Sequence, residues 1–134
     1  DIGTVEKYLQ AHMDVLEGRL HFAPDGHKKG QTWISPGGHV GRDVTFEGKS
    51  VLGSRTKVAD FVRFSGAVVV GPDCDIAQGA ALSNCVVLSG TRIGEGARLE
   101  GCVVGTHSNI EPHSVLGPGT ALGDHSHVTK FSQL

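Results

Sequence analysis

Large apolar residues recur at every sixth position through most of the chain. The series runs without a break from Ile34 to Leu88, drops one residue to Ile93, and drops one more between Leu99 and Val104. The anchors are Ile34, Val40, Phe46, Leu52, Val58, Phe64, Val70, Ile76, Leu82, Leu88, Ile93, Leu99, Val104, Ile110, Leu116, Leu122 and Val128. A short repeat sustained over this distance predicts a stack of similar structural units.

A second regularity shows what each unit is. Four places after an anchor stands a small or β-branched residue, such as Cys74, Val86 or Val103, and the residue just after an anchor is often Gly or Ala. Each six-residue unit is therefore predicted to be a short strand followed by a tight corner. Three units close one coil of about 18 residues, and successive coils pair as parallel strands about 4.8 Å apart. The anchors predict an all-β parallel β-helix of five to six coils over residues 34–134.

The segment 1–33 lacks this repeat and shows a helical period instead. Thr4 is a suitable N-cap, and Gly18 supplies a C-terminal stop. Apolar residues fall at helical spacing between them: Val5, Tyr8, Leu9, Met13 and Leu16. The stretch Arg19–Trp33 has no clear period and is predicted to be a connecting loop. One N-terminal α-helix and a loop thus precede the β-helix domain.

Composition agrees with this architecture and excludes several functions. The chain has 20 glycines in 134 residues and only 5% aromatic residues, as expected for a thin aliphatic interior with tight corners. A formal net charge of -2 argues against nucleic acid as a partner. No apolar run is long enough for a transmembrane helix, and no signal peptide is present, so we expect no membrane association and a cytoplasmic location. The chain begins at Asp1 without an initiator methionine, which suggests a fragment of a longer protein.

Three pairs of opposite charges are each separated by the length of one full coil. They are Arg42 with Asp60, Arg55 with Asp73, and Lys57 with Asp75. The spacing places the members of each pair on neighbouring coils. Surface ion pairs that fix the register of the coils are the favoured interpretation, and an anion- or nucleotide-binding face is the alternative.

The histidines are the candidate catalytic residues. His107 and His125 are separated by one full coil and are predicted to lie one above the other at one corner, while His113 lies at the next corner and His127 follows His125 by two. A neutral imidazole can act as a general base, and three imidazoles can hold zinc. No three of these histidines are predicted to converge within one chain, and ordinary exposed corner residues are the favoured interpretation.

The cysteines are expected to be structural. Cys74 fills a small fourth-place position and is predicted to lie in the core. Cys85 and Cys102 are separated by one shortened coil and are predicted to share an outer place on neighbouring coils. Free thiols are favoured over a disulfide, because stacking of this kind does not guarantee the required Cβ geometry.

The order of these elements resembles a known family. The opening Asp1–Leu9, DIGTVEKYL, is similar to the stretch that ends the catalytic domain of sugar-1-phosphate nucleotidyltransferases. The hexads LSNCVV at 82–87 and LEGCVV at 99–104 resemble the rungs of the C-terminal hexapeptide domains of mannose-1-phosphate guanylyltransferases and of related adenylyl- and thymidylyltransferases. For the chain as a whole, a mannose-1-phosphate guanylyltransferase-like enzyme is the favoured parent. The resemblance implies a left-handed β-helix, since hexapeptide-repeat proteins are the exception to right-handed crossovers.

The resemblance also implies a function for the parent protein. Such enzymes make a nucleoside diphosphate sugar from a nucleoside triphosphate and a sugar 1-phosphate, here GDP-mannose, with Mg²⁺ held in part by the aspartate that matches Asp1. The nucleotide-binding motif of the family is absent, so the chain alone is expected to have no catalytic residues and no cofactor. Its expected role is assembly and regulation as a homo-oligomer, with an exposed Phe61 or Val69 as contact residues.

Two other functions stay open at this point. A hexapeptide acyltransferase would use acyl-CoA with His107, His113 or His125 as general base. A carbonic-anhydrase-like or scaffold protein is the third possibility.

Overall fold

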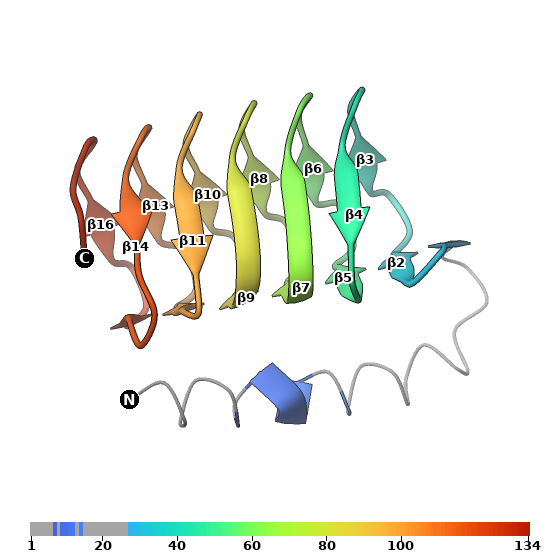
Figure 1. Ribbon diagram of the computed structural model, residues 1–134, viewed down its shortest axis with the longest axis horizontal. Coiled ribbons are helices and arrows are strands. Elements are labelled where there is room, and N and C mark those ends of the chain that lie inside the picture. The colour runs from blue at the N-terminus through green and yellow to red at the C-terminus, as the bar shows by residue number, and fades with distance from the viewer. Residues whose placement is uncertain (1–6, 8, 13, 15–26) are drawn as a thin grey trace.

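The computed structural model describes residues 7, 9–12, 14 and 27–134. Residues 32–134 form a left-handed parallel β-helix with three flat faces, and the N-terminal helix lies below one of them (Figure 1). Lys7, residues 9–12 and Asp14 are helical, which confirms the predicted helix at these positions. The predicted cap Thr4, the stop Gly18 and the apolar Val5, Tyr8, Met13 and Leu16 lie outside the described residues.

Each face of the β-helix is a column of short parallel strands. Face 1 contains β2 (Thr32–Ile34), β5 (Ser50–Leu52), the second half of β7 (Arg63–Val70), the second half of β9 (Ala81–Val87), β12 (Val103–Val104) and β15 (Ala121–Leu122). Face 2 contains β3 (His39–Val40), β6 (Lys57–Val58), β8 (Asp75–Ile76), β10 (Arg92–Ile93), β13 (Asn109–Ile110) and β16 (His127–Val128). Face 3 contains β4 (Thr45–Glu47), the first halves of β7 and β9, β11 (Arg98–Glu100) and β14 (Val115–Leu116).

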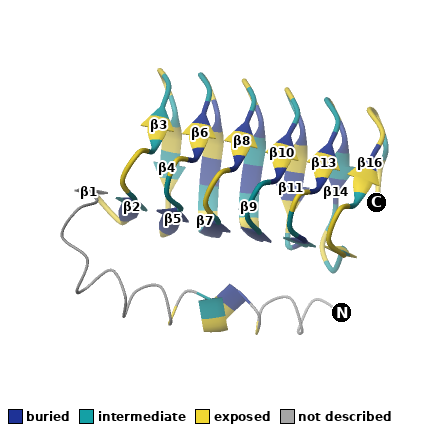
Figure 2. Cartoon of the chain, turned by 180° about the vertical axis from the view of Figure 1, so that it is seen from behind, coloured by how far each residue is buried: buried dark blue, intermediate teal, exposed yellow. Residues whose placement is uncertain are grey.

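The anchors form the core as predicted. On face 2, for example, Ile76, Ile93 and Ile110 pair in register on successive strands and are almost fully buried. In Figure 2 the buried residues appear dark blue along the strands, next to exposed residues in yellow. Small hydroxyl residues fill most of the fourth-place positions just before the face 2 strands, and their hydroxyls form hydrogen bonds with the backbone of neighbouring coils. The Thr91 hydroxyl donates to the carbonyl of Gly105 (2.9 Å) and accepts from the amide of Ser108 (3.2 Å).

One anchor was predicted wrongly. Val70 pairs with Val87, not with Leu88, so the first shortened unit ends at Val87. The cause is a bulge at the corner between faces 3 and 1, where two residues of β7, Gly66 and Ala67, oppose Asn84 alone. Leu88 is consequently half-buried outside the core.

The same one-residue shift changes the positions of Cys85 and Cys102 relative to the prediction. Val68 pairs with Cys85, so Cys85 occupies the small inner position that the sequence pattern assigned to Val86. Cys102 takes the corresponding position in the next coil, in place of Val103. Both cysteines are fully buried, and the prediction that they share an outer place is wrong.

The predicted loop over Arg19–Trp33 is also wrong in part. β1 (His27–Lys29) pairs antiparallel with β2, with Lys29 opposite Thr32, and the hairpin turns at Gly30 with φ of 62°. A two-residue connection of this kind favours a glycine with positive φ. The lysines and the glycine were interpreted as loop residues because their strand is too short to show a period.

Candidate functional site

Each coil has a left-handed residue at its corners, and these residues form three edges along the β-helix. Nine of these residues are not glycine, including His107, His113 and His125, with φ of 53°, 61° and 58°. A left-handed conformation costs roughly 1 kcal/mol for such residues. The candidate histidines are therefore all at corners, as predicted, and each is in a conformation that glycine or asparagine would adopt more easily.

The first edge, called the histidine edge, lies between faces 1 and 2. Its left-handed residues, in stacking order, are Gly37, Arg55, Asp73, Gly90, His107 and His125. The rings of His107 and His125 stack with centroids 5.6 Å apart and an interplanar angle of 14°, which confirms the predicted stack. The His107 ring lies over Gly90, where a Cβ atom would come within 2.3 Å of Nδ1. Glycine at this position is what allows the ring to pack against the corner.

The charges beside these histidines are anchored within the edge. Arg55 donates two hydrogen bonds to Asp73, from Nε (2.7 Å) and from an Nη atom (3.0 Å). These bonds hold the pKa of the Asp73 carboxyl below its ordinary value, and the charges of Arg55 and His107 act in the same direction. Asp124 accepts a hydrogen bond from the Thr106 amide (2.8 Å), which lowers the pKa of its carboxyl. The acidic groups of this edge therefore cap and pair with neighbouring coils.

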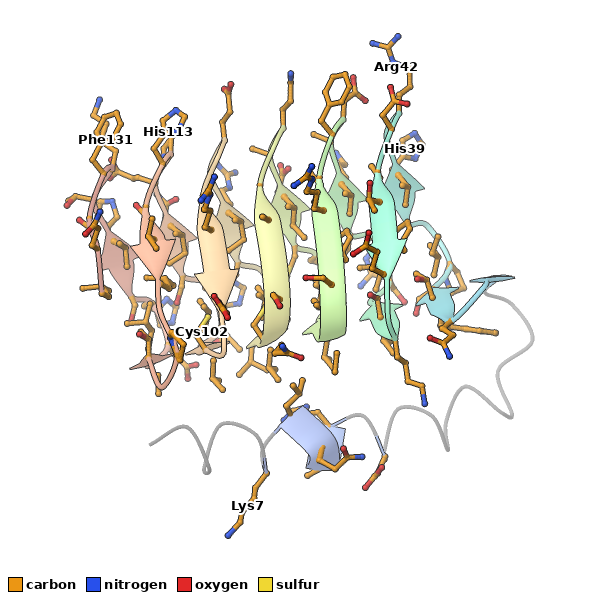
Figure 3. All side chains as sticks on the ribbon, in the orientation of Figure 1. Lys7, His39, Arg42, Cys102, His113 and Phe131 are labelled. Carbon is orange, nitrogen blue, oxygen red and sulfur yellow. The ribbon has the colours of Figure 1, made fainter. Side chains whose placement is uncertain are left out.

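The second edge, called the aromatic edge, lies between faces 2 and 3. Its left-handed residues are Asp43, Phe61, Gly79, Gly96, His113 and Phe131. The His113 and Phe131 rings stack at 5.3 Å with an interplanar angle of 11°, and Figure 3 shows them side by side at one end of the edge, with Arg42 near the other end. Phe61 and Phe131 are 49% and 70% exposed.

The three candidate bases do not form one site. His107 and His125 lie on the histidine edge, and His113 lies on the aromatic edge. Within the described part of the chain, none of the three rings has a hydrogen bond to a carboxylate that would orient it as a general base. No three His, Cys, Asp or Glu side chains among residues 7, 9–12, 14 and 27–134 are arranged to hold a metal ion.

His127 has a different partner from the other histidines. Its Nε2 atom pairs with a carboxylate oxygen of Glu111 on the preceding coil. This contact lowers the pKa of the Glu111 carboxyl, and the Lys130 amide and charge add to the effect. His127 is thus in contact with Glu111 at the C-terminal end of face 2.

Two of the three predicted charge pairs are formed. Arg42 contacts Asp60 at 3.4 Å, and the Arg42 amide also donates to Asp60 (2.8 Å), which lowers the pKa of that carboxyl. Arg55 and Asp73 form the second pair. Lys57 and Asp75 lie opposite each other on β6 and β8, but their charged atoms are not within 4.0 Å in the described structure. The formed pairs link coils, as the register interpretation requires.

An apolar stripe on the outside of face 1 was missed. Its residues pair in register from coil to coil and are Trp33, Val51, Val69, Val86, Val103 and Ala121. Leu9 of the N-terminal helix packs on this stripe with Val51, Val69 and Val86, and all four are at most 6% exposed. The prediction that Val69 is exposed is therefore wrong, because the helix covers it. The signal was present in the sequence as an apolar residue before every third anchor.

The thiols are free and buried. Cys74, Cys85 and Cys102 form no disulfide, which confirms the favoured interpretation. The Cys74 thiol donates to the carbonyl of Leu88 (3.2 Å), and burial raises the pKa of this thiol to about 11. The neighbouring Cys102 thiol, together with burial, raises the pKa of Cys85 well above its ordinary value. None of the three has the properties of a reactive nucleophile.

Comparison with known proteins finds similarity in both sequence and fold. The model of the GMPPB C-terminal domain matches residues 62–132. The UTP--glucose-1-phosphate uridylyltransferase of Synechocystis sp. is 33% identical over 74% of this chain. The bifunctional protein GlmU of Chromobacterium violaceum is 38% identical over 53%, and glucose-1-phosphate adenylyltransferase 1 of Vibrio parahaemolyticus is 30% identical over 87%. The chain spans 26%, 16% and 30% of the lengths of these three relatives.

A solved structure shows the same fold. The acetyltransferase domain of PglB from Neisseria gonorrhoeae superposes with a TM-score of 0.68 over 72% of this chain and 48% of that chain, at 21% identity. The repeat and the geometry define a hexapeptide-repeat, left-handed β-helix domain. The match over more than half of the 134 residues shows that the chain belongs to the GMPPB C-terminal domain family. This confirms the resemblance to the C-terminal domains of sugar-1-phosphate nucleotidyltransferases.

Proposed function

We propose that this chain is the assembly and regulatory segment of a sugar-1-phosphate nucleotidyltransferase. The parent enzyme would form a nucleoside diphosphate sugar, GDP-mannose in our proposal, from GTP and mannose 1-phosphate in the cytoplasm. Among the described residues, no helix is long and apolar enough to cross a membrane.

The observation that carries the proposal is the docking of the N-terminal helix on face 1. Leu9 is buried against Val51, Val69 and Val86, whereas Lys7 points away from the β-helix (Figure 3). Full burial of one leucine side chain contributes about 1.5–3 kcal/mol. The helix is therefore fixed on a rigid face, and it would hold a catalytic domain attached before it in a set position relative to the β-helix.

The choice of GDP-mannose rests on sequence likeness. The family match favours it, whereas the similarity of Asp1–Leu9 extends to sugar-1-phosphate nucleotidyltransferases in general. The uridylyl- and adenylyltransferase relatives use other bases by their names, so a direct comparison of substrates is required.

Magnesium enters only through the parent enzyme. Asp1, the proposed ligand, lies outside the described residues, and the described ones have no cluster of three metal-ligating side chains.

The test is an assay of the whole protein to which this chain belongs. GTP, ATP, UTP and CTP would each be supplied with mannose 1-phosphate or glucose 1-phosphate, and product formation measured by chromatography. The proposal expects the highest kcat/KM for GTP with mannose 1-phosphate. A preference for UTP or ATP with glucose 1-phosphate would keep the class of enzyme and overturn the assignment of base and sugar.

An acyltransferase is the second candidate, and the exposed corner histidines favour it. His113 is exposed at an edge and could face an acyl acceptor bound between subunits. Titration of the chain with acetyl-CoA by calorimetry distinguishes the two functions. Saturable binding that is lost in His113→Ala, or in His107→Ala or His125→Ala, would establish the acyltransferase and overturn our proposal.

A further inference from the structure

Phe61 lowers the stability of the isolated chain in two ways. It is 49% exposed, and it has a left-handed backbone with φ of 62°. An exposed ring does not contribute the free energy that burial of its apolar surface would give. The left-handed backbone conformation is one that glycine or asparagine adopts at lower cost. An aromatic side chain at such a position is therefore costly to stability and well placed to contact another molecule.

The position next to Phe61 on the same edge has no side chain, because it is occupied by Gly79. The amide of Phe61 donates to the carbonyl of Arg42, and the amide of Gly79 donates to that of Asp60, so Phe61 and Gly79 lie on successive coils, about 4.8 Å apart. A Cβ atom built on Gly79 would meet nothing within 4 Å, and Gly79 is exposed with φ of 73°. The aromatic edge thus presents an exposed ring beside an exposed glycine that faces open space.

From this juxtaposition we infer that two copies of the chain associate along the aromatic edge. The two β-helices run antiparallel, with the two-fold axis between the coil of Phe61 and the coil of Gly79. Phe61 of each copy then lies over Gly79 of the other copy. This inference rests on the proposed assembly function and names the surface that performs it.

Charges along the edge favour the same register. The residues that precede the left-handed positions are, in stacking order, Arg42, Asp60, Gln78 and Glu95. The proposed axis places Arg42 opposite Glu95 and Asp60 opposite Gln78. The Arg42 side chain is 83% exposed and contacts Asp60 of its own chain from one side at 3.4 Å, whereas Glu95 has no ion pair within the described structure.

Other registers are penalised by like charges. Moving the axis onto the coil of Phe61 places Asp60 opposite Asp60 of the other copy. Moving it onto the coil of Gly79 places Asp60 opposite Glu95. Moving it a full coil toward the C-terminus places Arg42 opposite Lys130. Like charges placed directly opposite each other disfavour these three alternatives. An axis between the coils of Asp43 and Phe61 would pair Arg42 with Asp60, but it would bring only two coils into contact and leave Gly79 uncovered.

The contact extends over four coils of a narrow edge, which is small for a stable dimer. The dimer of this chain is accordingly expected to be weak, and sedimentation velocity over a wide range of concentration is the appropriate measurement. Phe61→Asn relieves the backbone strain and removes the ring, so it should leave the fold intact and weaken the dimer by at least about tenfold. Phe131→Asn is the matched control, since Phe131 is equally left-handed and more exposed but lies outside the contact.

Charge-reversal variants test whether Arg42 faces Glu95 across the proposed axis. Arg42→Glu and Glu95→Arg should each weaken the dimer, and the double variant should recover most of the loss, because the pair is re-formed across the axis. A dimer that is insensitive to Phe61→Asn and to both reversals would overturn this edge but leave the proposed assembly function standing. A chain that stays monomeric at every concentration would overturn both.

Discussion

The Arg55 guanidinium donates two hydrogen bonds to the Asp73 carboxylate, and the two residues belong to neighbouring coils at the same corner. The pair lowers the pKa of Asp73 relative to the unfolded chain. A carboxyl whose folded pKa is depressed binds its proton more tightly in the unfolded state. Its contribution to stability is therefore complete above the ordinary aspartate pKa of 3.8 and is lost as the pH falls through the lower, folded value.

The first prediction concerns acid unfolding. In wild type, the melting temperature should fall more steeply below about pH 4 than in Asp73→Asn, because the variant lacks the titrating carboxylate. The variant should be less stable than wild type at pH 7 and closer to it at pH 2.5. Asp43→Asn is the matched control, since Asp43 is also left-handed and exposed but has no ion pair within the described structure. Parallel pH curves for wild type and Asp73→Asn would contradict the prediction.

The second prediction concerns the helix on face 1. Leu9→Ala should lower the free energy of unfolding by about 2 kcal/mol, because the side chain is buried against Val51, Val69 and Val86. Hydrogen exchange should increase selectively in the N-terminal helix while the face 2 strands keep their protection. Lys7→Ala, on an exposed position of the same helix, should change stability by less than about 0.5 kcal/mol. Equal effects of the two substitutions would show that the helix is not docked.

Most of the fold could be predicted from the sequence because the six-residue period is imposed by the geometry itself. Every anchor position must be apolar and every corner must be tight. Each anchor can therefore be identified in the sequence. The stacking of His107 on His125 followed from the same arithmetic. What the period could not reveal is where a coil loses a residue, because Val87 and Leu88 are both apolar and either could be the anchor. The deciding feature is the conformation of Asn84.

The candidate surfaces were less predictable than the core. The sequence identified Phe61 as an exposed contact residue, and its exposure is confirmed. It also identified Val69, which the helix covers. Contacts between coils follow from spacing, whereas the contact between Leu9 and the stripe joins segments without a shared period. The repeat marks the apolar stripe on face 1, but it does not show which segment of the chain covers the stripe.

The third prediction tests the bulge. Asn84 has φ of 48°, and its Oδ1 accepts a hydrogen bond from the amide of Ala67 (3.1 Å), which replaces a missing strand contact. Asn84→Ala should lower the free energy of unfolding by about 1–2 kcal/mol through the lost bond and the backbone strain. Asn84→Gly keeps the favourable backbone and should cost less than Asn84→Ala. Chemical denaturation measures both, and Asn109→Ala on the exposed side of β13 is the control. A larger loss for glycine than for alanine would show that backbone strain does not matter at this corner.

The fourth prediction concerns the three thiols. Cys74, Cys85 and Cys102 are buried, and the raised pKa values of Cys74 and Cys85 keep their nucleophilic thiolate forms scarce. A thiol reagent such as dithionitrobenzoate at pH 8 should therefore label none of them rapidly in the native chain and all three in urea. In the native chain, the rate of labelling should follow the rate of unfolding. Leu9→Ala should therefore increase the labelling rate only by the factor by which it increases the unfolding rate. Asn109→Cys provides an exposed thiol on β13 as a positive control and should react at once. Fast labelling of Cys85 or Cys102 in the native state would mean that the interior between faces opens without global unfolding.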